Sequence, residues 1–342
     1  MMPNPCARVV QRGTLGGQWV WVTAVNVFGG FLASTTVRLG FSRKAAIALA
    51  AVMLVASAWV SAEPGVLVLG RISNDPARHY GQLKPLLNYV VPRMADVGIR
   101  EGRILMANDV PMMQSYLRRG RVDWVTETTA AGMLLAQRAG AQLLMLSERG
   151  GRSHYASVIF ARRDSGIGSL AQLRGHRIAF QNRASTSSYI VPASLLLDAG
   201  LTLELLSSTR DQPAADTVGY LFARSDSNVL AWVEKGLVSA GAVSDIDWAR
   251  VHSSAAAQPS DLFEVMRSAP FPRGVEMVRA GMAAPVRDRL RAVLLAASHD
   301  PEGRAALAAY FGTTGFHLAD EHELAALAQM RARVVRVKAL LE

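Results

Sequence analysis

Short apolar runs and longer amphipathic segments alternate along the chain from residue 65 onward. Residues 65–70 form an apolar run of strand type, and residues 80–96 carry apolar side chains at helical spacing. The same order of strand and helix repeats in the ranges 103–106 and 111–118, then 122–126 and 129–139. This alternation predicts an α/β unit, with a mostly parallel sheet and helices on its faces.

A second unit of the same type follows, and the chain then returns to the first. Strand-like and helical runs continue through the ranges 155–161, 170–173, 178–180, 189–199, 218–222, 229–235 and 240–243. A return strand is predicted at 275–278 and tail helices at 285–297, 301–310 and 320–341. We therefore predict two lobes, the first from residues 63–157 and 274–342, the second from residues 158–273. A ligand cleft is expected between them, beyond the carboxyl ends of the strands.

The segment ahead of these lobes has the pattern of an export signal. Basic residues between 38 and 44 precede an apolar run at residues 45–60, and Val60-Ser61-Ala62 is a small-residue cleavage motif. This run is shorter than the roughly 20 residues that a membrane-spanning helix needs. Residues 38–62 are therefore predicted to be a cleaved signal peptide of a periplasmic protein, with a retained anchor as the alternative. Residues 1–37 are interpreted as a misassigned start or a disordered leader.

Charge and cysteine content narrow the function classes. The formal net charge is +10, and loss of residues 1–62 would remove five basic and no acidic residues, leaving +5. A mild positive excess suits an anionic ligand, but no basic stripe interleaved with aromatic residues is present, so nucleic acid is not expected as a partner. Cys6 is the only cysteine and precedes the predicted cleavage point, which excludes disulfides and thiolate chemistry from the mature chain. We expect a monomer.

A cluster of hydroxyl side chains opens one of the predicted helices. Ser185, Thr186 and Ser187 follow the strand-like residues 177–180 and precede a helical run. The first turn of a helix has unpaired N–H groups and partial positive charge, so it binds oxyanions well. Each hydroxyl would add a hydrogen bond without adding a charge, which suits a carrier that must release its ligand. Serine and threonine are also common helix caps, so a purely structural cap stays open as the alternative.

The sequence around this turn resembles a known family. Residues 155–167 read Tyr-Ala-Ser-Val-Ile-Phe-Ala-Arg-Arg-Asp-Ser-Gly-Ile, residues 170–180 read Leu-Ala-Gln-Leu-Arg-Gly-His-Arg-Ile-Ala-Phe, and residues 185–192 read Ser-Thr-Ser-Ser-Tyr-Ile-Val-Pro. In this order they resemble the phosphate, phosphite and phosphonate substrate-binding proteins of ABC transporters. The resemblance implies a two-lobed periplasmic binding fold of type II, with an oxyanion held in the cleft by Ser185, Thr186 and Ser187. It also implies an ABC permease in the inner membrane as partner.

Other positions carry the resemblance less closely. Tyr80 stands where the family tends to place a cleft tyrosine, and Asp245 stands near a family acidic residue that meets the amine of an aminophosphonate. The family motif Gly-Ser-His is replaced by Arg224-Ser225-Asp226, which puts the carboxylate of Asp226 where a donor is expected. Ser188 replaces the family glycine after Ser-Thr-Ser. These departures leave the ligand open among phosphate, phosphite, a phosphonate and another anion such as a sulfonate.

Glu127 and Thr128 lie where a predicted strand ends and the helix at 129–139 begins, so both are expected to point into the cleft. A carboxylate in contact with a phosphate costs roughly 1 to 4 kcal/mol, depending on the effective dielectric constant. Glu127 could therefore meet a cation carried by the ligand, or accept the proton of a singly protonated oxyanion. It could equally be a helix charge that needs no ligand.

The chain lacks the common sequence signatures of nucleotide cleavage and serine hydrolysis. The chain has no Gly-x-x-x-x-Gly-Lys-Ser/Thr loop, no Gly-x-Gly-x-x-Gly after a strand and no Gly-x-Ser-x-Gly elbow. His317 and His322 flank Asp320-Glu321 at a spacing that matches no zinc hydrolase helix, so neither a metal nor another cofactor is predicted. The favoured function is a transport receptor without enzymatic activity. A receptor of the same fold that signals to a membrane kinase or chemoreceptor is the alternative.

Overall fold

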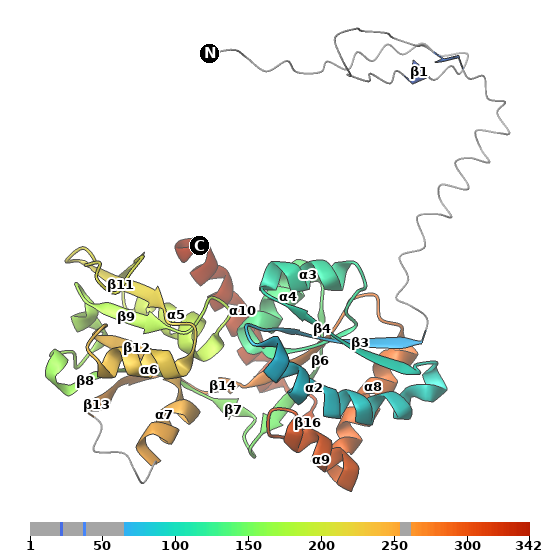
Figure 1. The fold of residues 1–342 in the computed structure, drawn as a ribbon. Coiled ribbons are helices and arrows are strands. Elements are labelled where there is room, and N and C mark those ends of the chain that lie inside the picture. Colours follow the sequence, from blue (N-terminus) through green and yellow to red (C-terminus); the bar gives the residue numbers. More distant parts are fainter. Residues whose placement is uncertain (1–20, 23–36, 39–64, 254–260) are drawn as a thin grey trace. The chain divides into compact units, whose positions relative to one another are not determined.

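The computed structural model describes residues 21–22, 37–38, 65–253 and 261–342 (Figure 1). The chain divides into two compact units, and the boundary along the sequence lies between Val60 and Ser61. Within the described residues, no helix is both long enough and apolar enough to cross a membrane.

The N-terminal unit contributes two short strands. Strand β1 (Trp21–Val22) pairs antiparallel with β2 (Val37–Arg38). Apart from these four positions, the predicted leader at 1–37 and the predicted signal peptide at 38–62 lie outside the described residues. Both stay predictions.

The first lobe is built on a six-stranded sheet with the strand order β16-β6-β15-β5-β3-β4. Its strands are β3 (Val66–Ile72), β4 (Glu101–Ala107), β5 (Trp124–Thr128), β6 (Gln142–Arg149), β15 (Gly274–Val278) and β16 (Thr313–His317). Strand β3 runs parallel to both of its neighbours, and the other neighbouring pairs are antiparallel. The chain leaves this sheet after β6 and returns to it with β15, where a return strand is predicted.

The second lobe is built on another six-stranded sheet, with the order β10-β11-β9-β12-β8-β13. Its strands are β8 (Ser157–Arg162), β9 (Arg177–Phe180), β10 (Thr202–Leu205), β11 (Thr217–Phe222), β12 (Ala240–Ser244) and β13 (Leu262–Arg267). Strands β10, β11, β9 and β12 are parallel, whereas β8 runs antiparallel to β12 and β13.

The predicted α/β class is confirmed, although the sheets are mixed rather than mostly parallel. Two of the five neighbouring pairs in the first sheet and three of the five in the second are parallel. Three of the antiparallel pairs involve β6, β13 or β16, strands that the sequence pattern does not predict. Strand β6 is rich in Leu and Met, which favour helices when isolated, so only its buried position in the sheet makes it a strand.

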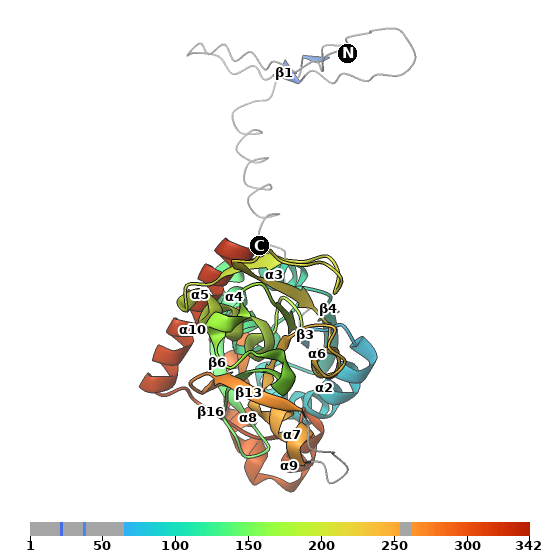
Figure 2. The same ribbon diagram turned by 90° about the vertical axis from the view of Figure 1, so that its left-hand side faces the viewer.

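Helices cover both sheets (Figures 1 and 2). In the first lobe they are α2 (Pro76–Val90), η1 (Val91–Val97), α3 (Val110–Arg118), α4 (Thr129–Ala139), α8 (Ala284–Ala296), η5 (Ala297–His299) and α9 (Pro301–Ala309). In the second lobe they are η2 (Arg163–Ser165), η3 (Leu170–Leu173), η4 (Thr186–Ile190), α5 (Val191–Asp198), α6 (Asp226–Glu234) and α7 (Asp245–Ser253). Asp75, Asp109 and Ser225 cap three of them, each accepting a first-turn N–H group.

Crossing strands and one long helix join the lobes. Strand β7 (His154–Tyr155) pairs antiparallel with β14 (Phe271–Pro272), so the chain passes twice from one sheet to the other here. Helix α10 (Glu321–Leu341) starts with a capping box and packs against α4 and α5, with a continuous apolar core at this contact (Figure 1). The predicted lobe boundaries, 63–157 with 274–342 against 158–273, stay a prediction, because α10 contacts both lobes.

Candidate functional site

The carboxyl ends of parallel strands from both sheets open on a cavity of about 880 Å³. The lining residues follow those strand ends: 71–75 at β3, 108–111 after β4, 127–128 at β5, 181–187 after β9, then Phe222, Arg224 and Asp226 at β11 and Ser244, Ile246 and Asp247 at β12. Ligands of α/β proteins bind at such ends, so this cavity is the candidate site.

The hydroxyl turn forms at the start of a helix, as predicted, and Ser185 is its cap. The Ser185 Oγ atom accepts the N–H group of Ser188 at 3.1 Å. The Ser188 hydroxyl donates to the carbonyl of Ala242 and accepts the N–H group of Gln181 at 3.1 Å, which fastens the turn to the sheet. The capping interpretation is therefore right for Ser185, and it leaves Thr186 and Ser187 outside the cap.

The turn directly contacts the N-terminus of α4 in the first lobe. The Thr186 Oγ1 atom accepts the N–H group of Ala130 at 2.9 Å, and the Thr128 hydroxyl donates to the carbonyl of Ala184 at 3.4 Å. One helix N-terminus from each lobe thus faces the cavity. Their first-turn amides and partial positive charges are suited to an oxyanion.

A buried tyrosine stands behind Ser187. The Tyr155 side chain lines the cavity, and burial raises the pKa of its phenol to about 12, against hydrogen bonds with Ser187 and Thr186 that lower it. Tyr155 is therefore a neutral hydrogen-bond donor at pH 7. The carbonyl of Ser187 accepts the Ser157 hydroxyl at 2.5 Å, which fixes the backbone of the turn against β8.

Glu127 lines the cavity from the carboxyl end of strand β5 rather than from a helix. Its Oε1 atom accepts the N–H group of Ile72 at 2.6 Å, so the carboxyl also holds β5 to the end of β3. Burial raises the pKa of Glu127, while the positive charge of Arg71 opposes the rise. A carboxyl with a raised pKa is protonated more readily, which lowers its repulsion of an anion.

Asp226 lines the second-lobe side of the cavity. Its Oδ2 atom accepts the Gln181 side-chain amide at 2.6 Å, and burial, with the charge of Asp247, raises the pKa of Asp226 to about 7. Asp247 also lines the cavity, and its carboxylate accepts the Ser244 hydroxyl at 2.5 Å. In residues 65–253 and 261–342, no group of three or more His, Cys, Asp or Glu side chains is placed to hold a metal.

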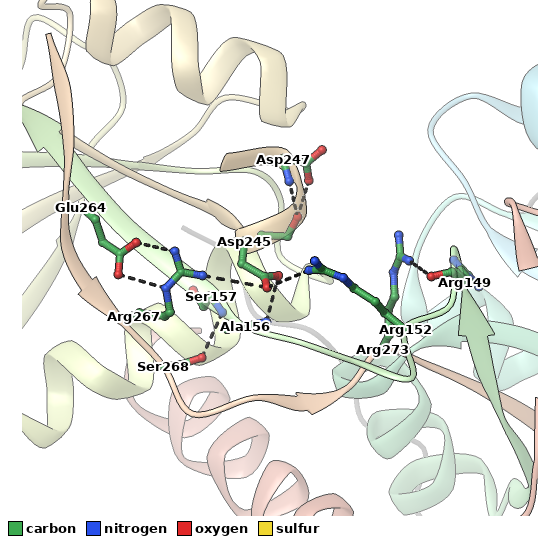
Figure 3. A network of polar contacts seen from close by, with 11 residues as sticks. Arg149, Arg152, Ala156, Ser157, Asp245, Asp247, Glu264, Arg267, Ser268 and Arg273 are labelled. Atoms are coloured by element: carbon green, nitrogen blue, oxygen red, sulfur yellow. Dashed lines mark hydrogen bonds and ion pairs between the residues drawn. The ribbon is translucent and has the colours of Figure 1, made fainter. Parts of the chain in front are cut away.

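Two residues of the predicted ligand set lie outside the cavity lining. Tyr80 is 45% exposed and lies beside Lys84. The carboxylate of Asp245 accepts the N–H group of Ala156 at 3.0 Å and faces Arg152 and Arg267 at 3.8 and 3.9 Å (Figure 3). We therefore leave Tyr80 and Asp245 out of the proposed ligand set, whereas Asp247, two positions further on, does line the cavity.

Basic side chains, which the sequence shows only as a dispersed excess, gather around the cavity. Seven arginines and one lysine line it against six carboxyl groups. The basic residues are Arg71, Arg78, Arg149, Arg183, Arg224, Arg250, Arg273 and Lys338. No local motif predicts them, because they come from strand ends, from loops and from three separate helices, α2, α7 and α10. The wall of the cavity is thus net positive, as an anion site requires.

Arg224 occupies the position of the first residue of the family motif Gly-Ser-His, and its backbone has a φ of 72°. This left-handed conformation is natural for glycine and costs an arginine on the order of 1 kcal/mol. The chain tolerates that cost at a residue whose side chain lines the cavity.

Comparison with known proteins decides the family. Residues 72–324 match the family model for the periplasmic substrate-binding protein of phosphonate ABC transporters. The chain belongs to this family. XAC2383 of Xanthomonas citri, solved with chloride and with ATP, is 52% and 50% identical in the two structures. The alignments cover 80% and 81% of this chain and 99% and 100% of XAC2383, with a TM-score of 0.77 in both.

More distant solved structures share the fold. The binding component of an ABC phosphonate transporter from Pseudomonas aeruginosa is 18% identical over 81% of this chain and 88% of its own, with a TM-score of 0.58. PhnD1 of Prochlorococcus marinus, solved with methylphosphonate, is 16% identical over 80% of this chain and 100% of its own, also with a TM-score of 0.58. The predicted type II periplasmic binding fold is confirmed. Family members are substrate-binding components of transporters rather than enzymes, with an ABC permease as partner.

Proposed function

We propose that the chain captures a small phosphorus oxyanion or organophosphonate in its cleft and delivers it to an ABC permease. The contact between Thr186 and the N–H group of Ala130 carries this proposal, because it brings one helix N-terminus from each lobe to the same point. An oxyanion there would accept hydrogen bonds from the amides and hydroxyls of Thr186 and Ser187, and it would share or take over the Ala130 N–H group that Thr186 Oγ1 accepts in the structure. The Tyr155 phenol, neutral at pH 7, would supply one more donor.

Binding and lobe closure are coupled in this proposal. Since donors come from both lobes, only the closed arrangement satisfies the ligand fully, and the ligand shifts the population toward it. The permease then recognises the closed form. No covalent bond is made or broken. The protein acts as a monomer in the periplasm, and residues 38–62 are its export signal.

A nucleotide is the second candidate ligand. XAC2383, at 50% identity, has been solved with ATP, and a cavity of about 880 Å³ lined by eight basic side chains has room and charge for a polyphosphate. Both candidates place a phosphorus oxyanion at the two helix N-termini. They differ in what fills the rest of the cavity.

A thermal-shift screen of the full chain against phosphate, phosphite, methylphosphonate, methanesulfonate and ATP tests the proposal. A ligand present at 100 times its dissociation constant stabilises the folded protein by about 2.7 kcal/mol, which gives a clear rise in melting temperature. We expect a rise with at least one phosphorus oxyanion, and loss of about half of it in Ser187→Ala, since a tenfold weaker affinity at the same ligand concentration lowers the stabilisation to about 1.4 kcal/mol. Ser194→Ala is the matched control, because Ser194 is buried in the next helix and lies outside the cavity lining. No shift with any phosphorus compound, or an equal shift in both variants, would overturn the proposal.

A further inference from the structure

Two arginines of the first lobe share one aromatic ring. The guanidinium carbon of Arg71 lies 4.3 Å from the centroid of the Phe311 ring, and that of Arg149 lies 4.8 Å from it. Both arginines line the cavity. Phe311 has a φ of 56°, a left-handed conformation that costs energy in a bulky residue. The backbone is thus strained at the residue that supports both guanidinium groups.

The two positive charges lack a carboxylate partner of their own. The Nε atoms of both arginines are buried without a hydrogen-bond partner, and Arg71 otherwise donates to the carbonyl of Thr126 at 3.3 Å. In the part of the chain that the structure describes, neither guanidinium forms an ion pair. Burial, together with the charge of Arg71, lowers the pKa of Arg149 to about 10. A buried donor without a partner costs free energy, which an incoming acceptor would recover.

The acidic groups nearest to the pair are occupied elsewhere. Glu127 accepts the N–H group of Ile72. The buried carboxyl of Glu276 accepts hydrogen bonds from Trp124, Thr126 and Tyr310, and burial raises its pKa to about 7. Neither carboxyl therefore supplies the oxygen atoms that the two guanidinium groups need.

The histidine beside the Phe311 ring, His79, carries no charge at neutral pH. His79 lies 5.7 Å from Phe311, centroid to centroid, and lines the cavity. Burial, with the charges of Arg71 and Arg78, lowers its pKa to about 4, against the charge of Asp75. His79 therefore remains neutral beside the arginine pair at pH 7.

The arginine pair stands next to the oxyanion position of the proposed function. The charges of Arg71 and Arg149 both act on the carboxyl of Glu127. The following residue, Thr128, is the N-cap residue of α4, and the Ala130 amide in the first turn of that helix donates to Thr186. One compact ligand could therefore reach both places.

We infer that Arg71 and Arg149 form a second anion subsite, and that the ligand carries two anionic groups. This inference rests on the proposed function, which assigns the first group to the two helix N-termini. The ligand class is then an organophosphonate or phosphate ester with a second phosphoryl or carboxylate group, held by bidentate guanidinium contacts.

Calorimetric titration of the full chain with methylphosphonate and with alkylene bisphosphonates of one, two and three methylene groups tests this subsite. We expect at least one bisphosphonate to bind at least about tenfold more tightly than methylphosphonate. Arg149→Gln and Arg71→Gln should each remove that advantage and change methylphosphonate affinity by less than about threefold. Both variants are used so that one folding failure does not decide the result.

Arg78→Gln is the matched control, because Arg78 lines the same cavity but is exposed, and the substitution removes the same charge. It should change the affinity for both kinds of ligand by less than about threefold, somewhat more for the more highly charged bisphosphonates, as a general field effect does, and it should leave most of the bisphosphonate advantage in place. A bisphosphonate advantage that persists in Arg71→Gln and Arg149→Gln overturns the second subsite and leaves the proposed function intact. The second subsite is also overturned, with the proposed function intact, if methylphosphonate binds and no bisphosphonate binds more tightly. If wild-type protein binds none of these compounds, the second subsite is overturned, and the proposed function fails as well when phosphate and phosphite give no thermal shift.

Discussion

The first-lobe wall of the cavity presents paired guanidinium groups, whereas the hydroxyl turn of the second lobe presents hydroxyls and first-turn amides without formal charge. Arg71 and Arg149 are half-buried side chains whose buried Nε atoms have no hydrogen-bond partner. Thr186 and Ser187 are neutral donors, and their neighbours Ser185 and Ser188 already hold the turn in place. Neutral donors bind an oxyanion at little desolvation cost and release it readily. Buried charges discriminate more strongly, because they are costly until an anion meets them.

The largest effect is expected when the hydroxyl turn loses its side-chain donors. The double variant Thr186→Val with Ser187→Ala removes both hydroxyls, and we expect it to weaken methylphosphonate binding about 100-fold, since each hydrogen bond to a charged group contributes about 1.5 to 3 kcal/mol. Isothermal titration calorimetry measures this. Unliganded stability should also fall by about 1 kcal/mol, because the Ala130 amide loses its acceptor. Ser194→Ala should leave the affinity unchanged, and a double variant that binds like wild type would show that the turn takes no part in binding.

The second prediction concerns Asp226, a carboxyl in the second-lobe wall of the cavity. Burial raises the folded-state pKa of Asp226 to about 7, above the unfolded value near 4, so the folded protein holds more protons in that interval. Stability must therefore fall as the pH rises from 4 to 7. Asp226→Asn should remove this contribution and stabilise the protein at pH 8 by on the order of 2 kcal/mol, after allowance for partial solvent exposure.

Urea unfolding of wild type and Asp226→Asn at pH 4 and pH 8 separates this contribution from that of Glu276, whose pKa is raised in the same direction. The variant should differ from wild type far more at pH 8 than at pH 4. An equal difference at the two pH values would mean that Asp226 titrates normally.

Single substitutions within the turn sharpen the division between cap and ligand contact. Ser185→Ala removes the cap and should lower the free energy of unfolding by about 1 kcal/mol with little change in affinity for methylphosphonate. Ser187→Ala should do the reverse, with an affinity loss of about tenfold and little change in stability. Thermal melts and titrations of the two proteins side by side would reveal whether these roles are exchanged.

The smallest expected effect concerns the strained arginine. Arg224→Gly relieves the φ of 72° but adds freedom to the unfolded chain, so a net stabilisation of about 0.5 kcal/mol is expected. Arg224→Ala keeps the strain and removes the same side chain. Denaturant midpoints that are equal for the two variants would contradict a cost at this position.

The hydroxyl turn was predictable because its donors are consecutive in sequence and stand between a strand and a helix. The alternation of elements and the return strand β15 were predictable for the same local reasons. The arginine pair was not, since Arg149 ends β6, a Leu- and Met-rich strand without a strand-like pattern, and its partner residues come from β3 and from the turn after α9. Asp245 entered the ligand set through the family resemblance, which does not tell which way a carboxylate turns: in the structure Asp245 faces Arg152, and Asp247 lines the cavity.

The most direct test follows individual amides by 1H–15N nuclear magnetic resonance while methylphosphonate is added to the full chain at constant salt. An oxyanion held between the lobes predicts large downfield shifts of Ala130 in the first lobe and of Thr186 and Ser187 in the second, saturating at the same ligand concentration. Shifts confined to one lobe, or none at these three amides, would contradict the account.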